Sequence, residues 1–456
     1  MAEQVLTTTP SPLEDLKEKN ETIKPTFEEQ VLAYSSLYSM ALICIIWGSI
    51  RSLRFVQRKI ARKELLDTSI LTKDAKKFPI TASLVLFGLY LVFKGTDNGI
   101  LPYIQTKAGP YLPEPRNDSS PSMGTNLLNK VSNLHPLAAK AVEKAADYLP
   151  EFNKANVVYF LLLLLCWEGC NCLATILEPF FAFFLKRLPV GNRWPRRNIP
   201  YLLVLKRGKK ELEEGELEKA AKKDTEYLIS CEFNTHFLVA LFFTSFVGIS
   251  HLYQRHWITN NLLGIAFSIY GIEALHLSSF KAGTILLSGL FIYDVFWVFG
   301  TDVMTTVAKG IDAPILLMFP QDILRKGWLD ASKHGMLGLG DIVIPGIFIA
   351  LLRRFDHYVG SKKGKDAKSR YYFVTTVFAY ALGLFITMGV MHFFEAAQPA
   401  LLYLVPTCVL IPLLLAAIRG EFKALWSYSE EHLVEKEEEE AKKEQPKENK
   451  KEKKNQ

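Results

Sequence analysis

Two acidic residues, Asp294 and Asp341, lie inside long apolar runs of the sequence. A charge at the centre of a membrane helix costs about 2.5–3.5 kcal/mol on insertion scales, so such residues are candidates for function. No Lys or Arg lies within two helical turns of Asp294 to neutralise it. The other acids in apolar runs are Glu168, Glu178 and Glu273. We interpret Glu168 and Glu273 as packing or hydrogen-bonding residues.

A pair of carboxyl groups a few ångströms apart has a specific chemistry. The two groups are not readily ionised at the same time, so they share one proton and titrate as a unit. One group then activates a water molecule as a base while the other donates a proton as an acid, which suits hydrolysis of a peptide bond. This reaction needs no covalent intermediate, metal or other cofactor. Buried acids alone also fit an ion path, as in a proton-coupled transporter, or polar contacts in a non-catalytic scaffold.

The elements that must position these acids are membrane helices. The chain has 456 residues, of which 49% are hydrophobic, and its charges stand in blocks between apolar stretches. A membrane-spanning helix needs about 20 apolar residues. We therefore predict an all-α polytopic membrane protein with about nine transmembrane helices. They are expected at 31–50, 79–95, 156–185, 236–250, 258–277, 282–301, 336–352, 372–393 and 399–418.

These spans divide the chain into four expected regions. Residues 1–30 form an N-terminal tail, 31–277 a first helical bundle and 278–419 a second bundle that holds both aspartates. Residues 420–456 are rich in Lys and Glu, so we predict a disordered tail. The net charge of +7 is a topology signal and does not indicate nucleic-acid binding, because the basic residues do not alternate with aromatic residues.

The distribution of basic residues predicts the orientation. The segment after the first span is basic, so we place it in the cytosol and the N-terminus in the lumen. Nine spans then leave the C-terminus in the cytosol. Two glycosylation sequons, at Asn20 and Asn117, fall in segments predicted to be luminal. The chain ends in Lys453-Lys454-Asn455-Gln456, which resembles a dilysine retrieval signal of endoplasmic-reticulum membrane proteins.

Three short motifs lie in consecutive order along the second bundle. They are Tyr293-Asp294, then Gly338-Leu339-Gly340-Asp341, then Pro399-Ala400-Leu401. This set resembles the YD, GxGD and PAL motifs of the presenilin-type intramembrane aspartyl proteases. Within that class the surrounding sequence is similar to signal peptide peptidase, over about residues 31–418.

The resemblance implies a presenilin-like fold and a role for each motif. Asp294 and Asp341 would be the catalytic dyad, Tyr293 would pack beside it, and Pro399, Ala400 and Leu401 would shape the floor of the active site. Gly338 and Gly340 allow close approach beside Asp341, with Leu339 between them.

The resemblance also implies partners. With a luminal N-terminus the active site would be inverted relative to presenilin. The expected substrates are therefore transmembrane peptides of type II orientation, namely signal peptides left by signal peptidase, and tail-anchored proteins. Homo-oligomers and membrane-protein quality-control partners are further expectations, in the lipid bilayer of the endoplasmic reticulum.

Two other features complete the sequence. Between the catalytic spans, residues 311–328 are apolar but contain Pro314 and Pro320, so we expect a re-entrant or extended segment, or a loop on the membrane surface. An extended segment would offer a strand edge to an unwound substrate. The six cysteines form no disulfide framework, and we interpret Cys166, Cys170 and Cys172 as packing residues and not as a metal site.

Overall fold

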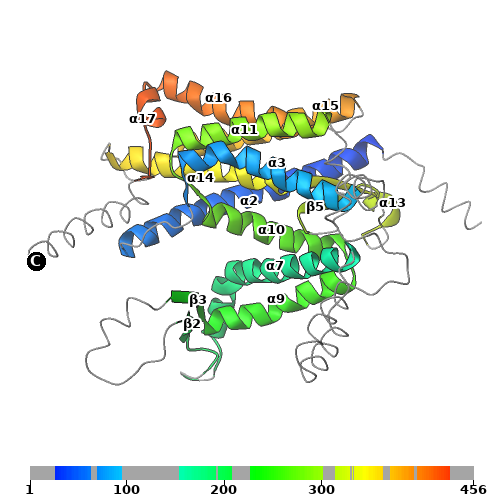
Figure 1. Cartoon of the computed structure of the whole chain (residues 1–456), viewed down its shortest axis with the longest axis vertical. Helices are drawn as coiled ribbons and strands as arrows, with labels where there is room; N and C mark the ends of the chain where they lie inside the picture. Colours follow the sequence, from blue (N-terminus) through cyan, green and yellow to red (C-terminus); the bar gives the residue numbers. More distant parts are fainter. Residues whose placement is uncertain are drawn as a thin grey trace, which may run out of the picture.

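Nine long helices make up most of the part of the chain that the computed structural model describes (Figure 1). They are α2 (Phe27–Arg62), α3 (Thr72–Lys94), α7 (Lys154–Leu185), α9 (Thr235–Tyr253), α10 (Trp257–Ala274), α11 (Phe280–Phe299), α14 (Gly340–Lys362), α15 (Tyr371–Phe394) and α16 (Leu401–Ile418). The described residues are 26–62, 69–94, 154–189, 191, 194–207, 226–300, 314–328, 331, 333–362, 370–394 and 398–431.

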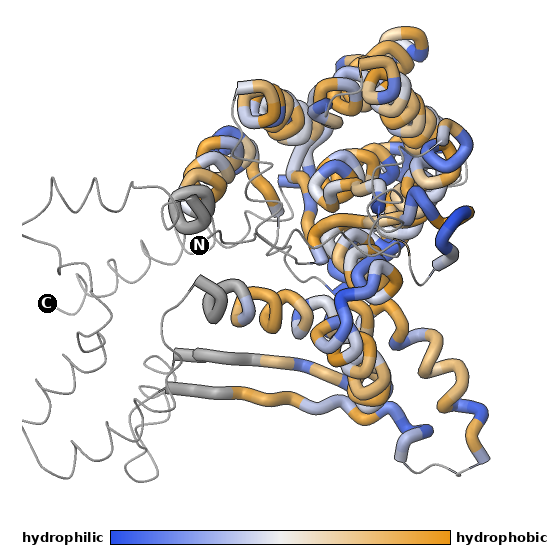
Figure 2. The backbone as a smooth tube through the Cα atoms, turned by 90° about the vertical axis from the view of Figure 1, so that its right-hand side faces the viewer, coloured by the Kyte–Doolittle hydropathy of each residue, from blue (hydrophilic) through white to orange (hydrophobic). Residues whose placement is uncertain are grey.

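Each of the nine predicted spans overlaps with one of these helices. Among the described residues, six helices are long and apolar enough to cross a membrane: α2, α7, α9, α11, α15 and α16. Large apolar side chains such as Phe242, Ile292 and Leu414 are exposed on the outer surface, as lipid contact requires. Figure 2 shows many apolar residues, in orange, along the helices. The prediction of an all-α polytopic membrane protein is confirmed, whereas the number of spans stays a prediction.

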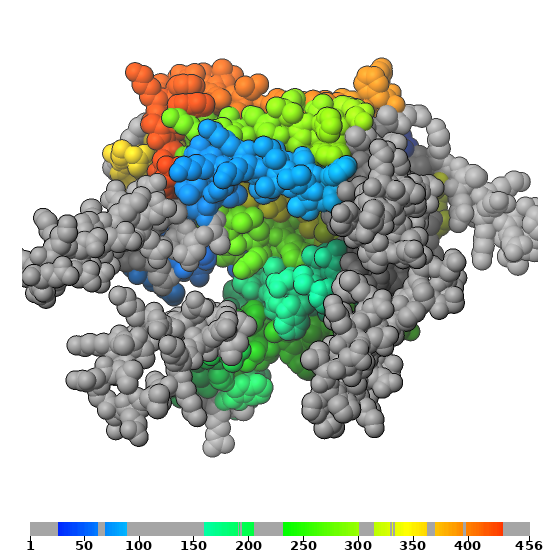
Figure 3. All heavy atoms as spheres, viewed as in Figure 1, coloured from blue at the N-terminus to red at the C-terminus, as the bar shows by residue number. Residues whose placement is uncertain are grey.

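The first and second predicted bundles share one hydrophobic core. The largest cluster of buried residues includes Leu37 and Ile45 from α2 together with Phe348 from α14 and Tyr380 from α15. In Figure 3, α3 lies against α11 on the visible face. A division of the chain at residue 277 therefore does not separate two cores.

The structure corrects the predicted span 336–352. Its first residues belong to a strand, β6 (His334–Gly338), and α14 begins only at Gly340 and continues to Lys362. Arg353 and Arg354, which follow the predicted span, consequently lie within α14. Arg354 is buried because a carboxylate from the C-terminal segment pairs with it.

The structure also corrects the predicted tail, whose first part is ordered. Residues Phe422–Trp426 form α17, and Leu425 is fully buried. Glu430 pairs with Arg354, and the backbone around Tyr428 bonds to the start of α11. The order has a physical cause, since apolar residues continue to Tyr428 before the charge-rich run begins. Residues 432–456, including the lysines of the retrieval signal, lie outside the described part.

Short strands form three two-stranded sheets. They are β1 (Ser69–Ile70) with β4 (His276–Leu277), β2 (Pro200–Arg207) with β3 (Glu226–Asn234), and β5 (Leu316–Pro320) with β6. We did not predict the hairpin of β2 and β3, and the Lys/Glu-rich stretch between them lies outside the described residues. The hairpin of β5 and β6 is followed directly by α14, and so it borders Asp341.

Candidate functional site

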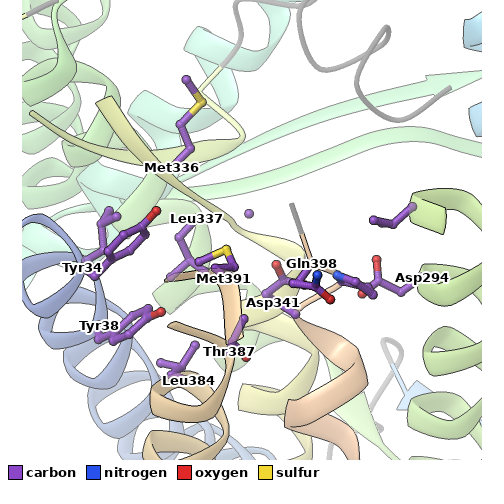
Figure 4. Close-up of a pocket in the computed structure, with 15 residues that line it drawn as sticks. Tyr34, Tyr38, Asp294, Met336, Leu337, Asp341, Leu384, Thr387, Met391 and Gln398 are labelled. Carbon is purple, nitrogen blue, oxygen red and sulfur yellow. The ribbon is translucent and has the colours of Figure 1, made fainter. Parts of the chain in front are cut away.

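Asp294 and Asp341 line the same cavity, which has a volume of about 130 Å³ (Figure 4). Asp294 lies in the second half of α11 and is only 5% exposed. Asp341 is in the first turn of α14. The cavity is large enough to hold a few water molecules. The structure thus brings together the two acids that the sequence singled out, from helices that are 40 residues apart in the chain.

The Pro399-Ala400-Leu401 motif contacts Asp294 through its backbone. The Leu401 N–H donates a hydrogen bond to Asp294 Oδ2 at 3.1 Å. Leu401 begins α16, and the first N–H groups of a helix have no partner inside it. A carboxylate at this position satisfies one such N–H and meets the positive end of the helix dipole. Pro399 and Ala400 line the cavity, as expected for residues that shape its floor.

The backbone around Asp341 leaves little space on one side. A Cβ atom at Gly338 would lie 3.3 Å from Asp341 Oδ2, so a larger residue would crowd the carboxylate. A Cβ atom at Gly340 would meet no atom within 4 Å, so crowding does not explain that glycine. Tyr380 of α15 is fully buried and donates a hydrogen bond from its hydroxyl to the Asp341 carbonyl oxygen at 3.1 Å. Sequence reasoning missed Tyr380, because a tyrosine in an apolar span has no distinguishing signal.

Neither aspartate has a cationic partner within the described part of the chain. No group of three or more metal-ligating side chains occurs among the described residues either. The site therefore presents two carboxyl groups, backbone donors and space for water. These are the components that acid–base hydrolysis by a carboxyl pair requires.

Part of the segment 311–328, which we expected to be re-entrant or extended, forms strand β5, which pairs antiparallel with β6. The short helix α13 (Ile323–Lys326) follows it, and residues 311–313 lie outside the described part. Met318 lies opposite Met336, and Leu316 lies opposite Gly338. Leu339 N–H donates to Ile315 carbonyl oxygen, so hydrogen-bonded pairs fall at alternate positions and Met318–Met336 is a non-hydrogen-bonded pair. The backbone groups of Met336 consequently point away from β5. Only β6 of this hairpin contributes residues to the described lining of the cavity.

Comparison with known proteins identifies the family. The family model described as "Signal peptide peptidase" matches residues 62–432. The chain belongs to the signal peptide peptidase family. A protein named Intramembrane protease 2 from Caenorhabditis elegans is 52% identical, with 91% of this chain and 94% of that protein covered. A protein named Signal peptide peptidase from Homo sapiens is 40% identical, with 90% and 87% covered. No solved structure matches the chain. This protein is therefore an intramembrane aspartyl protease.

The remaining predicted site residues of this signal peptide peptidase family member do not line the cavity in the described structure. Tyr293 is half-buried and packs with Trp297, their ring centroids 6.3 Å apart, so it lies next to Asp294 without lining the cavity. Leu339 faces α10, where its side chain lies close to Gly264. Asn20 and Asn117 lie outside the described residues. All six cysteines are free.

Proposed function

We propose that Asp294 and Asp341 are the catalytic dyad with which this protease hydrolyses peptide bonds inside the membrane. The observation that carries the proposal is that both carboxyl groups line one small cavity without a neutralising cation in the described structure. Leu401 and Tyr380 support the arrangement by holding Asp294 Oδ2 and the Asp341 carbonyl oxygen, respectively.

The reaction follows from one proton shared by the two carboxyl groups. The unprotonated carboxylate takes a proton from a water molecule, which attacks the carbonyl carbon of the substrate. The protonated carboxyl gives its proton to the carbonyl oxygen, so that a gem-diol forms. The carboxyl that accepted the water proton then protonates the leaving nitrogen as the C–N bond breaks, and a diol hydroxyl gives a proton back to the other carboxylate. The dyad returns to its starting state with one proton.

We propose that the substrate binds as an extended strand along the outer edge of β6. A helical peptide has all its backbone groups paired, so it must unwind before its peptide bond becomes accessible. In a membrane the freed groups need new partners, because an unsatisfied backbone group there costs several kcal/mol. The outward-pointing backbone of Met336, a few residues before Asp341, offers such partners by strand addition. Met336 is 58% exposed and lines the cavity.

The substrate class that we propose is type II transmembrane segments, notably signal peptides after signal peptidase cleavage, in the endoplasmic reticulum membrane. Tail-anchored proteins share this orientation. The basic residues Arg51, Arg54 and Arg58 in the last part of α2 support a luminal N-terminus and a cytosolic C-terminus. The name of the human relative, Signal peptide peptidase, supports this substrate class. Homo-oligomers and membrane-protein quality-control partners remain proposals of the same kind.

The proposal is tested with purified protein and a synthetic signal peptide. We expect the wild-type protein to cleave the peptide and the Asp294→Ala and Asp341→Ala variants to leave it intact. Glu168→Gln is the matched control, because Glu168 is another acid in an apolar helix but lies outside the cavity. Cleavage that persists in either aspartate variant would refute the dyad. A transporter would instead move ions in the presence of aspartyl protease inhibitors.

The orientation is tested separately by glycan mapping. We expect glycans at Asn20 or Asn117 and none at a sequon introduced between 363 and 369, after the end of α14. A glycan in that segment would show that the orientation is the reverse of the proposed one, and it would also refute the type II substrate class.

A further inference from the structure

Two consecutive asparagines near the start of α10 contact the edge of β5 that faces away from β6. Asn261 Nδ2 donates to Met318 carbonyl oxygen at 2.6 Å, and the Met318 N–H donates to Asn261 Oδ1 at 2.8 Å. Asn260 Nδ2 donates to Leu316 carbonyl oxygen at 2.6 Å. Both asparagines are almost fully buried, with exposed fractions of 2% and 5%. The function proposed above uses neither of them.

The Asn261 amide takes the place of a neighbouring strand. A primary amide carries one acceptor and a pair of donors in one plane, so it can pair with both the N–H and the C=O of a single residue. Leu316 and Met318 lie at alternate positions of β5, and their outer backbone groups would otherwise remain unpaired in a buried place. Asn260 and Asn261 therefore close the outer edge of β5 to any further strand.

The other side of the hairpin is different. The backbone of Met336 on β6 points away from β5 and bonds to no other described residue, and Met336 lines the cavity. The hairpin thus has one edge closed by α10, whereas its other edge is unpaired at Met336 among the described residues, five positions before Asp341. A strand added to this hairpin has only the β6 edge to pair with.

We propose that Asn260 and Asn261 are positioning residues that direct the unwound substrate to β6 and set which of its peptide bonds reaches the dyad. This inference rests on the proposed binding of substrate as a strand. The asparagines act on β5, β5 fixes the position of β6 through the ladder, and β6 sets the register of the added strand relative to Asp341.

Close packing makes the position of the hairpin sensitive to these contacts. A Cβ atom at Gly264, one turn after Asn260, would lie 3.0 Å from Leu317 Cδ2, so α10 and β5 are in direct contact. Farther along, Trp257 Nε1 donates to Trp328 carbonyl oxygen at 3.1 Å. A slip of two residues along a strand moves the backbone by about 7 Å and keeps the same face, so it would bring a different bond to Asp341.

The test compares Asn261→Leu and Asn260→Leu with wild-type protein, using a synthetic signal peptide and mass spectrometry of the products. Leucine has a similar size and no hydrogen-bonding group. We expect the KM of Asn261→Leu to rise about tenfold, which corresponds to about 1.4 kcal/mol, with cleavage spread over additional bonds. Ser268→Ala is the control, because Ser268 is also buried in α10 but bonds only to Gly264 of the same helix. Cleavage at the wild-type bond alone, with unchanged KM, would overturn the proposal.

A second measurement uses only wild-type protein, so it does not depend on the folding of a variant. We expect the Met318 amide to exchange its hydrogen at least about tenfold more slowly than the Met336 amide. Equal exchange would show that the β5 edge is open and would refute the inference. The two proposals can be refuted independently. Activity in Asp341→Ala would refute the catalytic dyad. If Asp341→Ala is inactive but Asn261→Leu cleaves with the wild-type pattern, only the positioning role is refuted.

Discussion

The charged side chains toward the two ends of α14 differ in whether they have a partner of opposite charge. At its beginning, Asp341 faces a cavity with Asp294 and has no cationic partner within the described residues. Toward its other end, Arg354 is buried, and each of its three guanidinium nitrogens donates a hydrogen bond. Its Nε donates to both oxygens of Glu430 at 3.1 and 3.0 Å, and its Nη1 donates to Ser52 Oγ at 3.0 Å.

Two neighbouring groups, Asp356 and Tyr428, are hydrogen-bonded as well. The carboxylate of Asp356 accepts hydrogen bonds from the Tyr372 and Phe373 N–H groups at the start of α15. Tyr428 donates its hydroxyl proton to Glu430 at 2.6 Å. Burial, with Glu430 beside it, raises the pKa of Tyr428 well above its ordinary value, so the hydroxyl remains a donor.

The comparison distinguishes two roles of charged residues whose burial costs free energy. A buried charge with a complete set of partners has no group left to offer a substrate, and removing one partner leaves the other unpaired. A buried carboxyl pair without a cation keeps its proton exchangeable. We infer that the second end of α14 holds the fold together while the first end carries out the chemistry.

The largest expected effect is on activity at the dyad end. Asp341→Asn keeps the size of the side chain but removes the acid–base group, so we expect cleavage to fall about 10²- to 10⁴-fold. Thermal unfolding should occur at the wild-type temperature or above, because no ion pair is lost. A low melting temperature in this variant would mean that Asp341 has a structural role as well.

The next effect is on stability at the paired end. Arg354→Met leaves Glu430 buried without its cation, so we expect a loss of about 3–5 kcal/mol of stability, measured by thermal unfolding in detergent. Adding Glu430→Gln to this variant should recover part of the loss. An unchanged melting temperature in Arg354→Met would contradict the assignment of this pair to the fold.

The smallest expected effect concerns the orientation of Asp341 by Tyr380. Tyr380→Phe removes only the hydrogen bond to the Asp341 carbonyl oxygen, which contributes about 1 kcal/mol. We expect kcat to fall about fivefold with little change in KM, since the tyrosine orients Asp341 and does not line the cavity. A change in KM alone would indicate that Tyr380 acts on substrate binding instead.

The sequence predicted the parts of the fold that follow from local composition. Apolar runs gave the helices, and the three motifs gave Asp294, Asp341 and the Pro399-Ala400-Leu401 turn. Contacts between distant residues had no local signal. The predicted span ended before Arg354, because its partner Glu430 is 76 residues away in a segment that we predicted to be disordered.

The same limit applies near the site. Two asparagines in an apolar helix do not indicate that their amides pair with a strand 57 residues later. The extended segment was one of several open interpretations, because its two prolines disfavour a helix without specifying a strand. Only the three-dimensional structure shows which edge of that strand is closed.

The most direct test of the account measures the cleavage rate per folded molecule for Asp341→Asn and for Arg354→Met, each purified and assayed under the same conditions. Folded protein is counted by size-exclusion chromatography below the melting temperature of both variants. The account predicts an inactive but stable Asp341→Asn and an unstable Arg354→Met whose folded molecules cleave at close to the wild-type rate. Activity in Asp341→Asn, or inactive folded Arg354→Met, would contradict the separation of chemistry from stability along α14.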